Sequence, residues 1–209
     1  MGKIVVSQFI TLDGVFEDPG GSEGTERGGW AFRFDRGAEG DQFKLDELTA
    51  AGALLLGRVT YEGFAQAWPS RTDEIGFAAK MNGLPKYVVS STLRRGDWNN
   101  TTVLKDNLPD EARRLKDQVD GDILIYGSGH LVRALQEHDL IDEYRLILYP
   151  VVLGAGKRLF GEAGRPHAVR LAETRPAGEC LILIYHPKGA DGAPESASER
   201  HTRAGSPAR

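Results

Sequence analysis

The sequence predicts an α/β domain in which helices flank a mainly parallel central sheet, so that the domain has three layers. Short β-rich runs alternate with helical patterns along the chain, which is typical of this class. Several runs, such as ALLL and ILIY, are apolar throughout, as interior parallel strands covered on both faces are. The last two runs follow each other without a helical pattern between them, so we expect an antiparallel pair at the C-terminal end.

The expected strands share a high content of aliphatic and aromatic residues. They are Lys3–Ile10, Ala53–Leu56, Lys86–Ser90, Thr101–Leu104, Asp122–Tyr126, Glu143–Tyr149 and Cys180–His186.

Helices are expected where apolar residues recur at helical spacing or where end signals occur. Residues 109–119 begin with a proline and two acids, which favour a first turn, and place apolar side chains on one face. A second helix is expected over 41–51, with Gly52 as its C-terminal cap. The stripe Tyr61, Phe64, Ala65 and Trp68 indicates a third helix that packs into the core.

The composition is that of a folded globular protein. Of 209 residues, 40% are hydrophobic and 27% are charged, and no apolar run approaches the ~20 residues of a membrane span. We expect a cytoplasmic protein, since the N-terminus has no signal-peptide pattern. The net charge of -4 argues against a nucleic-acid or anionic-membrane surface.

The chain is expected to form one domain over residues 1–186. Residues 187–209 contain no aliphatic residue larger than alanine and no aromatic residue, so they cannot offset their ordering entropy by burial. We therefore expect a flexible tail there. Cys180 is the chain's single cysteine and lies in a strand-like run, which favours a buried thiol. No metal-binding motif is present in the sequence.

Glycine-containing turns follow several of the expected strands, at the positions where open α/β sheets bind their ligands. The chain contains 26 glycines, more than its length predicts. Gly57 leads from a strand into a helix near Arg58, and Gly127 to Gly129 do the same later. Free N–H groups at such helix starts favour phosphate, although a plain strand-to-helix turn has the same pattern.

The glycine-rich segment 12–30 follows the first strand. A loop of this length inside a compact domain is usually a lid over a site or is disordered, and its position after a core strand favours the lid.

Taken in order, these motifs resemble the dihydrofolate reductase-like superfamily. The segments VSQFITLDGVFEDP, LLLGRVTYEGF, YVVSSTL, ILIYGSGHLVRAL and DEYRLILYPVVLGAGKRLF are most similar to the C-terminal reductase domain of bifunctional riboflavin-biosynthesis proteins. The resemblance covers nearly the whole domain. It implies the three-layer fold of that superfamily, a reductase that uses NADPH on a pterin or pyrimidine, and a homodimer.

The resemblance also assigns roles to residues in three turns. By their match to the family turns, the residues implied to contact the cofactor are Gly57, Arg58, Thr60, Ser90, Ser91, Gly127, Ser128, Gly129, His130 and Leu131. Ser90 and Ser91 match the strand end near the adenosine 2′-phosphate.

Two carboxylates are candidates for the proton source that reduction of an imine-like carbon requires. Asp35 follows Trp30 in a manner similar to the acid of dihydrofolate reductases, although aspartate is equally favoured as a helix N-cap. Asp13 lies in the segment TLDG, where it could line the pocket or cap the turn.

The resemblance thus implies an NADPH-dependent reductase of a small heterocyclic substrate, similar to 5-amino-6-(5-phosphoribosylamino)uracil reductase. The alternative is a non-catalytic nucleotide- or pterin-binding module that kept the fold and lost its substrate chemistry.

Overall fold

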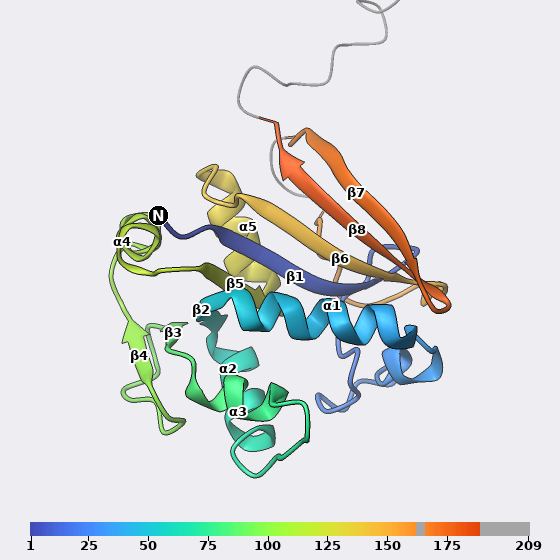
Figure 1. Cartoon of the computed structure of the whole chain (residues 1–209). Coiled ribbons are helices and arrows are strands. Elements are labelled where there is room, and N and C mark those ends of the chain that lie inside the picture. The colour runs from blue at the N-terminus through green and yellow to red at the C-terminus, as the bar shows by residue number, and fades with distance from the viewer. Residues whose placement is uncertain (162–165, 189–209) are drawn as a thin grey trace, which may run out of the picture.

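A computed structural model describes residues 1–161 and 166–188 and has one sheet with the strand order β4-β3-β2-β5-β1-β6-β8-β7 (Figure 1). The first six strands in this order run parallel, while β8 is antiparallel to both of its neighbours. The α/β class and the antiparallel closure of the sheet are confirmed. The strands are β1 (Ile4–Thr11), β2 (Ala51–Gly57), β3 (Lys86–Val89), β4 (Thr101–Leu104), β5 (Asp122–Tyr126), β6 (Glu143–Tyr149), β7 (Val169–Ala177) and β8 (Cys180–Pro187).

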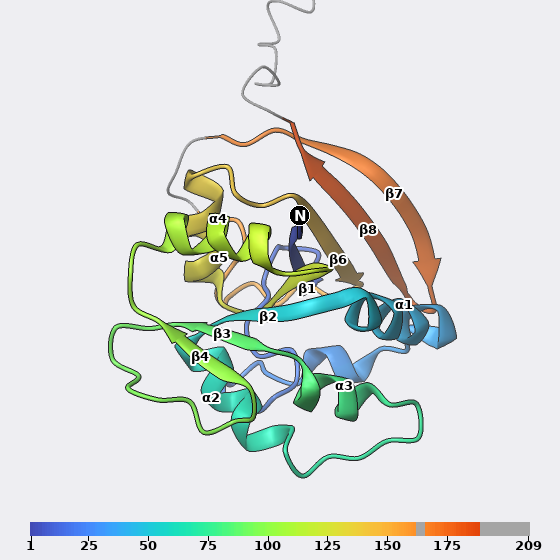
Figure 2. The same cartoon turned by 60° about the vertical axis from the view of Figure 1, so that its left-hand side comes forward.

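Helices cover both faces of the sheet, which gives the three expected layers. They are α1 (Gly37–Ala50), α2 (Arg58–Ala67), α3 (Phe77–Gly83), α4 (Leu108–Gln118) and α5 (Gly129–Glu137), with a short 3-10 helix, η1, at Trp30–Arg33. Figure 1 shows α1 in front of the sheet and α5 behind it, and Figure 2 shows the β7–β8 hairpin at one end of the sheet. The predicted helices over 109–119 and from Arg58 are confirmed within a residue or two.

The two faces of the sheet form separate apolar cores. Leu115 of α4 and Val132 of α5 pack with Ile123 and Ile125 on one face. Leu48 of α1 packs with Leu54 on the other, in the same cluster as the buried Tyr61 of α2. Tyr61 is thus a core residue, as its helical stripe predicted.

Two details of the sequence interpretation were wrong. Gly52 does not cap α1, because the helix ends at Ala50 and the chain enters β2 at once. A Cβ at this position would clash with the backbone oxygen of Asp120, so the glycine permits close packing of two chain segments. Strand β7 was missed altogether. Its residues are exposed except for Ala177, and it therefore lacks the apolar alternation that marks a half-buried strand.

Strand β8 extends to Pro187, and the Lys188 N–H donates to the carbonyl of Ala168. The remainder of the expected tail, 189–209, lies outside the described residues.

The carboxyl ends of the parallel strands, and the turns that follow them, lie along the same end of the sheet. We call this end the carboxyl edge of the sheet, as distinct from its outer strands. Gly57 at the end of β2 pairs with Val89 at the end of β3. Tyr126 at the end of β5 pairs with Ser7 of β1. The predicted turns after β2, β3 and β5 are therefore neighbours in space, although they are distant in the sequence.

Lys86, the first residue of β3, is fully buried. Its ammonium donates to the Asn82 carbonyl at 2.6 Å and lies 4.1 Å from the centroid of the Trp98 ring. Among the described residues no carboxylate forms an ion pair with it. Burial lowers the pKa of Lys86 to about 8. The folded protein therefore releases this proton at lower pH than the unfolded chain does.

This difference predicts a pH-dependent stability. Between about pH 8 and the ordinary lysine value of ~10.4 the unfolded chain binds more protons, so the free energy of unfolding rises with pH in that window, by about 1–3 kcal/mol. Lys86→Met should remove this rise. Urea unfolding at several pH values across the window measures it, with the exposed Lys105→Met as the matched control. A rise of equal size in Lys86→Met and in the unsubstituted protein would contradict the assignment.

Candidate functional site: the junction of two helix starts

The Ser128 hydroxyl joins the start of α5 to the start of α2. It accepts the Gly57 N–H at 2.7 Å and donates to the Thr60 hydroxyl at 3.0 Å. Gly57 is the N-cap of α2, and Ser128 is the N-cap of α5. Gly57 has no side chain, and the Ser128 hydroxyl does not bond to its own helix, so no side chain among the described residues caps the first N–H groups of either helix. The Ser128 bridge holds these two helix starts side by side. Two positive helix ends held together can bind a polyanion.

The glycines at this junction are required by its geometry. Gly127 has φ +63°, and a Cβ there would lie 2.7 Å from the Thr60 hydroxyl oxygen. A Cβ at Gly129 would lie 2.6 Å from the Phe16 ring. Side chains at these positions would separate the two helix starts or displace Phe16. The predicted turns therefore form one compact cradle.

Gln8 was not predicted from the sequence, yet it contacts this cradle. Its side chain is 6% exposed, and its amide Nε2 donates to the Gly127 carbonyl at 2.8 Å. A buried glutamine in a strand gives no sequence signal of its own. Its role depends on the pairing of Ser7 with Tyr126, which places residue 8 next to residue 127.

Arg58 and the predicted serines lie along the same edge. Arg58 is exposed on the first turn of α2, where it pairs with Glu62 at 2.8 Å. The Ser90 hydroxyl follows β3 and accepts the N–H groups of Thr92 and Leu93. Ser91 is exposed. The guanidinium of Arg58 and the hydroxyl of Ser91 are thus open to a ligand, whereas the Ser90 hydroxyl holds its own turn.

His130 and Leu131 occupy different environments within α5. His130 is exposed, and its ring lies 3.1 Å from a guanidinium nitrogen of Arg133. The side chain of Leu131 is buried in the core. Leu131 can therefore offer a ligand its backbone N–H, whereas the ring of His130 can contact one.

Asp13 stabilises a turn between two loops. Its carboxylate accepts the Thr11 hydroxyl at 2.7 Å and the N–H groups of Leu153 and Gly154 at 3.1 and 2.8 Å. The Thr11 hydrogen bond, aided by the backbone donors, lowers the pKa of Asp13 to about 2. A carboxyl with this pKa carries no proton at neutral pH. The Asp13 carboxylate therefore caps this turn, and its contact with a substrate stays a prediction.

Asp35 lies at the start of α1, beside the β7–β8 turn. Its carboxylate accepts the Gly37 N–H at 2.7 Å, and its own N–H donates to Glu179. The side chain thus binds the first residue of the helix, although the N-cap position belongs to Arg36. No hydrogen bond or ion pair between described residues links Asp35 to the Ser128 junction. Asp35 is therefore not the N-cap of α1, although its carboxylate binds the start of that helix, and its role as a proton source stays a prediction.

The loop after β1 folds around the buried Asp18. The Asp18 carboxylate accepts the Glu23 N–H and both the N–H and the hydroxyl of Thr25. Trp30 is fully buried, and its indole N–H donates to the Glu17 carbonyl. The loop is thus an organised structure with its own polar centre. Its movement as a lid remains a prediction.

A basic groove of about 390 Å³ adjoins the start of α5. It is lined by Phe16, Gly129, His130, Arg133, Gly156, Lys157, Arg158 and Gly161. Two of its cations are already paired, because Lys157 contacts Glu17 and Arg158 lies 3.9 Å from Asp13. The groove is a second place near α5 where an anion could bind.

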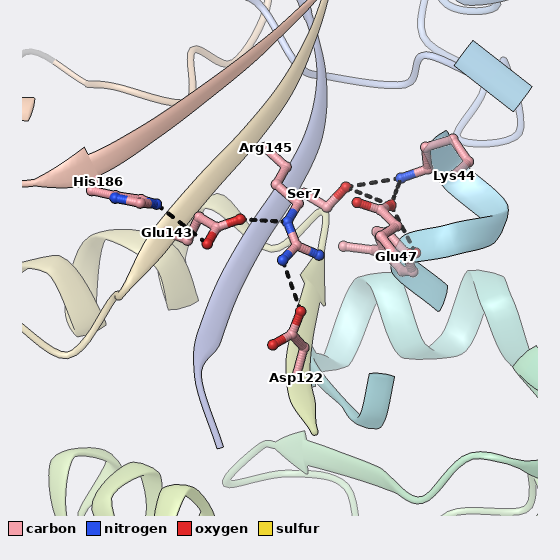
Figure 3. A network of polar contacts seen from close by, with 8 residues as sticks. Ser7, Lys44, Glu47, Asp122, Glu143, Arg145 and His186 are labelled. Atoms are coloured by element: carbon pink, nitrogen blue, oxygen red, sulfur yellow. Dashed lines mark hydrogen bonds and ion pairs between the residues drawn. The ribbon is translucent and has the colours of Figure 1, made fainter. Parts of the chain in front are cut away.

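A buried polar network lies between α1 and the sheet (Figure 3). Lys44 and Glu47 of α1 form an ion pair, and both contact the Ser7 hydroxyl of β1 at 2.8 Å. The Tyr126 hydroxyl donates to the same Glu47 oxygen at 3.1 Å, and the other oxygen has no partner among the described residues. Burial lowers the pKa of Lys44, an effect that Glu47 opposes. Sequence reasoning missed this pair, because charged residues on a helix usually face water.

Arg145 of β6 extends the polar row across the same face, since it lies beside Ser7 of β1 in the sheet. It pairs with Glu143 at 2.6 Å and with Asp122 at 2.8 Å. His186 lies 3.4 Å from Glu143.

The remaining candidate chemistries find little support. Cys180 is buried as predicted, and burial raises the pKa of its thiol to about 11, far from the range of a reactive thiolate. Within residues 1–161 and 166–188, no group of three His, Cys, Asp or Glu side chains could hold a metal ion. No helix in the described part of the chain is long and apolar enough to cross a membrane.

Two similar sequences from one bacterium cover almost the whole chain. The uncharacterized protein YyaP of Bacillus subtilis (strain 168) is 28% identical over 191 residues, which span 90% of this chain and 96% of YyaP. YwjB of the same organism is 27% identical over 183 residues and is also uncharacterized.

Solved structures share the fold. A protein from Shewanella sp. PV-4 that is named for riboflavin biosynthesis has a TM-score of 0.70 at 22% identity, with 90% of this chain and 99% of that chain covered. The deaminase/reductase of Thermotoga maritima, diaminohydroxyphosphoribosylaminopyrimidine deaminase/5-amino-6-(5-phosphoribosylamino)uracil reductase, has a TM-score of 0.62 at 14% identity. This chain covers 57% of that bifunctional protein.

The family comparison agrees with the fold and with the order of the turns. The sequence profile described as the RibD C-terminal domain matches residues 2–183, nearly the whole described part of the chain. The resemblance seen in the sequence motifs is thereby confirmed, and this chain belongs to the RibD C-terminal domain family.

Proposed function

We propose that this protein is an NADPH-dependent reductase of a small heterocyclic substrate, pyrimidine- or pterin-like, similar to 5-amino-6-(5-phosphoribosylamino)uracil reductase. The observation that carries the proposal is the Ser128 hydroxyl bridge between the starts of α2 and α5. It gathers free N–H groups of two helices at one edge, where a dinucleotide pyrophosphate fits the charge and the geometry. Membership of the RibD C-terminal domain family supports a reductase.

The residues of the chain fit the cofactor along this edge. The N–H groups at the starts of α2 and α5 would hold the pyrophosphate, and the glycines at 127 and 129 leave its approach open. Arg58, whose side chain is 44% exposed, and Ser91 would face the adenosine phosphate. When bound there, NADPH supplies a hydride. The protein's part is to orient the donor and the substrate and to exclude water beneath the loop after β1.

The proton source decides between the reductase and the non-catalytic binding module. Asp13 binds backbone N–H groups of a turn and Asp35 binds the first N–H group of α1, which favours the binding module. The Lys44–Glu47 pair favours the enzyme, because it places titratable groups against Tyr126, the residue directly before Gly127. A measurement of NADPH oxidation distinguishes the reductase from the non-catalytic binding module.

Cofactor binding gives the first test. NADPH should raise the melting temperature of the protein, and Arg58→Ala should weaken NADPH binding by about tenfold, because a hydrogen bond to a charged group contributes ~1.5–3 kcal/mol. The exposed Arg113→Ala, which loses a similar ion pair on α4, should bind NADPH unchanged. No thermal response at millimolar NADPH would remove the cofactor assignment, and an unchanged affinity in Arg58→Ala would reject the role of that arginine.

Turnover gives the second test. The absorbance of the reduced nicotinamide should fall when the protein and NADPH are mixed with a panel of pterins and aminopyrimidines. Binding of NADPH without oxidation on any member of the panel is the result expected of the non-catalytic module, and it would count against the enzyme.

We also propose that the protein is a homodimer, with β6, β8 and β7 at the interface. On one face of these strands Leu148 pairs with Leu181 and Leu146 pairs with Leu183. The adjoining groove of about 310 Å³ is lined mainly by apolar residues. Leu171 and Leu181 are 47% and 41% exposed, an unusual density of exposed apolar side chains on one sheet face.

Measurement of the oligomeric state tests the role of this sheet face. Light scattering should give twice the chain mass for the unsubstituted protein, and the double change Leu171→Asp and Leu181→Asp should give the monomer. Ile75→Asp, at an exposed apolar residue outside this face, should remain a dimer. A monomeric unsubstituted protein at micromolar concentration would contradict the proposal.

A further inference from the structure

The orientation of one peptide unit at the Ser128 junction depends on Gln8. The side-chain amide of Gln8 donates to the Gly127 carbonyl at 2.8 Å, so this carbonyl points into the sheet. The peptide that joins Gly127 to Ser128 is trans, as are all peptides between described residues. In a trans peptide the C=O and N–H groups point in opposite directions. The Ser128 N–H therefore points away from Gln8, towards the open edge.

The turn itself does not fix this orientation. Gly127 has φ +63°, and glycine adopts positive and negative φ about equally well, so the peptide after it can rotate at little cost. Within the described part of the chain, no hydrogen bond takes up the Ser128 N–H. The Gln8 amide is thus the contact that holds the carbonyl inward.

We infer that Gln8 is a positioning residue for the anion site: its amide holds the Gly127–Ser128 peptide so that the Ser128 N–H joins the first N–H groups of α5 in facing a bound pyrophosphate. This inference rests on the proposed function for the identity of the ligand. The peptide orientation itself rests on the Gln8 contact alone.

The chemistry of the glutamine amide predicts what substitutions do. Glutamate at position 8 offers no donor to the Gly127 carbonyl when ionised, and its oxygens repel the carbonyl oxygen. They can accept the Ser128 N–H instead, which would turn the peptide over and withdraw a donor from the ligand. Methionine has a similar shape but no hydrogen-bond donor, so the Gly127–Ser128 peptide could adopt either orientation.

The experiment compares Gln8→Glu and Gln8→Met with the unsubstituted protein. Calorimetry with NADPH and with inorganic pyrophosphate should give dissociation constants about tenfold higher for Gln8→Met, and higher still for Gln8→Glu. In amide NMR spectra, the Ser128 resonance should shift with pyrophosphate in the unsubstituted protein and should lose this shift in both variants. Gln66→Glu, an exposed glutamine on α2, is the matched charge control.

The outcomes separate the two proposals. If the unsubstituted protein binds neither probe, the proposed function fails. The crystal structure of Gln8→Glu then still tests the inference about Gln8. An inverted Gly127–Ser128 peptide in that variant supports the inference, and an unchanged peptide overturns it. If the unsubstituted protein binds and both variants match it within twofold, Gln8 has no positioning role. A uniform loss of folding in Gln8→Glu leaves Gln8→Met and the Ser128 resonance as the deciding measurements.

Discussion

The candidate site depends on one side chain, the hydroxyl of Ser128, which uses both its acceptor and its donor capacity to tie two helix starts together. Without it, α2 and α5 would each present an ordinary N-terminus on opposite faces of the sheet. With it, the two helix ends become one positively polarised region at the carboxyl edge of β2 and β5. A protein with net charge -4 can in this way hold a local anion site without a large basic surface.

The sheet registers make this tie possible. Pairing of β2 with β5 and of β5 with β1 brings Gly57, Gly127 and Gln8 to the same edge, although they are up to 119 positions apart in the chain. Below that edge, the Lys44–Glu47 pair is kept in the interior at a cost in desolvation, which its contacts with Ser7 and Tyr126 offset in part. The polar groups in the interior are thus concentrated next to the strand that ends at the junction.

Much of the architecture was readable from the sequence, because apolar runs and helix-end residues report burial and chain direction locally. The strand–turn–helix units at Gly57 and Gly127 are of this kind. What escaped prediction is non-local. Strand β7 has exposed side chains and owes its existence to pairing with β8. The roles of Gln8 and Glu47 depend on contacts with residues that are distant in the sequence. Gly52 permits a close approach to the backbone of Asp120. For Asp13 and Asp35, the sequence left two interpretations of each. Their hydrogen-bond partners show what each carboxylate binds within the fold, and their roles towards a substrate stay predictions.

A crystal structure of the protein grown with NADP⁺ tests the central claim most directly. The account predicts that both phosphorus atoms of the pyrophosphate lie at the Ser128 junction, with oxygens in hydrogen-bond contact with N–H groups at the starts of α2 and α5. Pyrophosphate located instead in the basic groove of Phe16, Arg133 and Lys157, with the junction free of ligand, would contradict it.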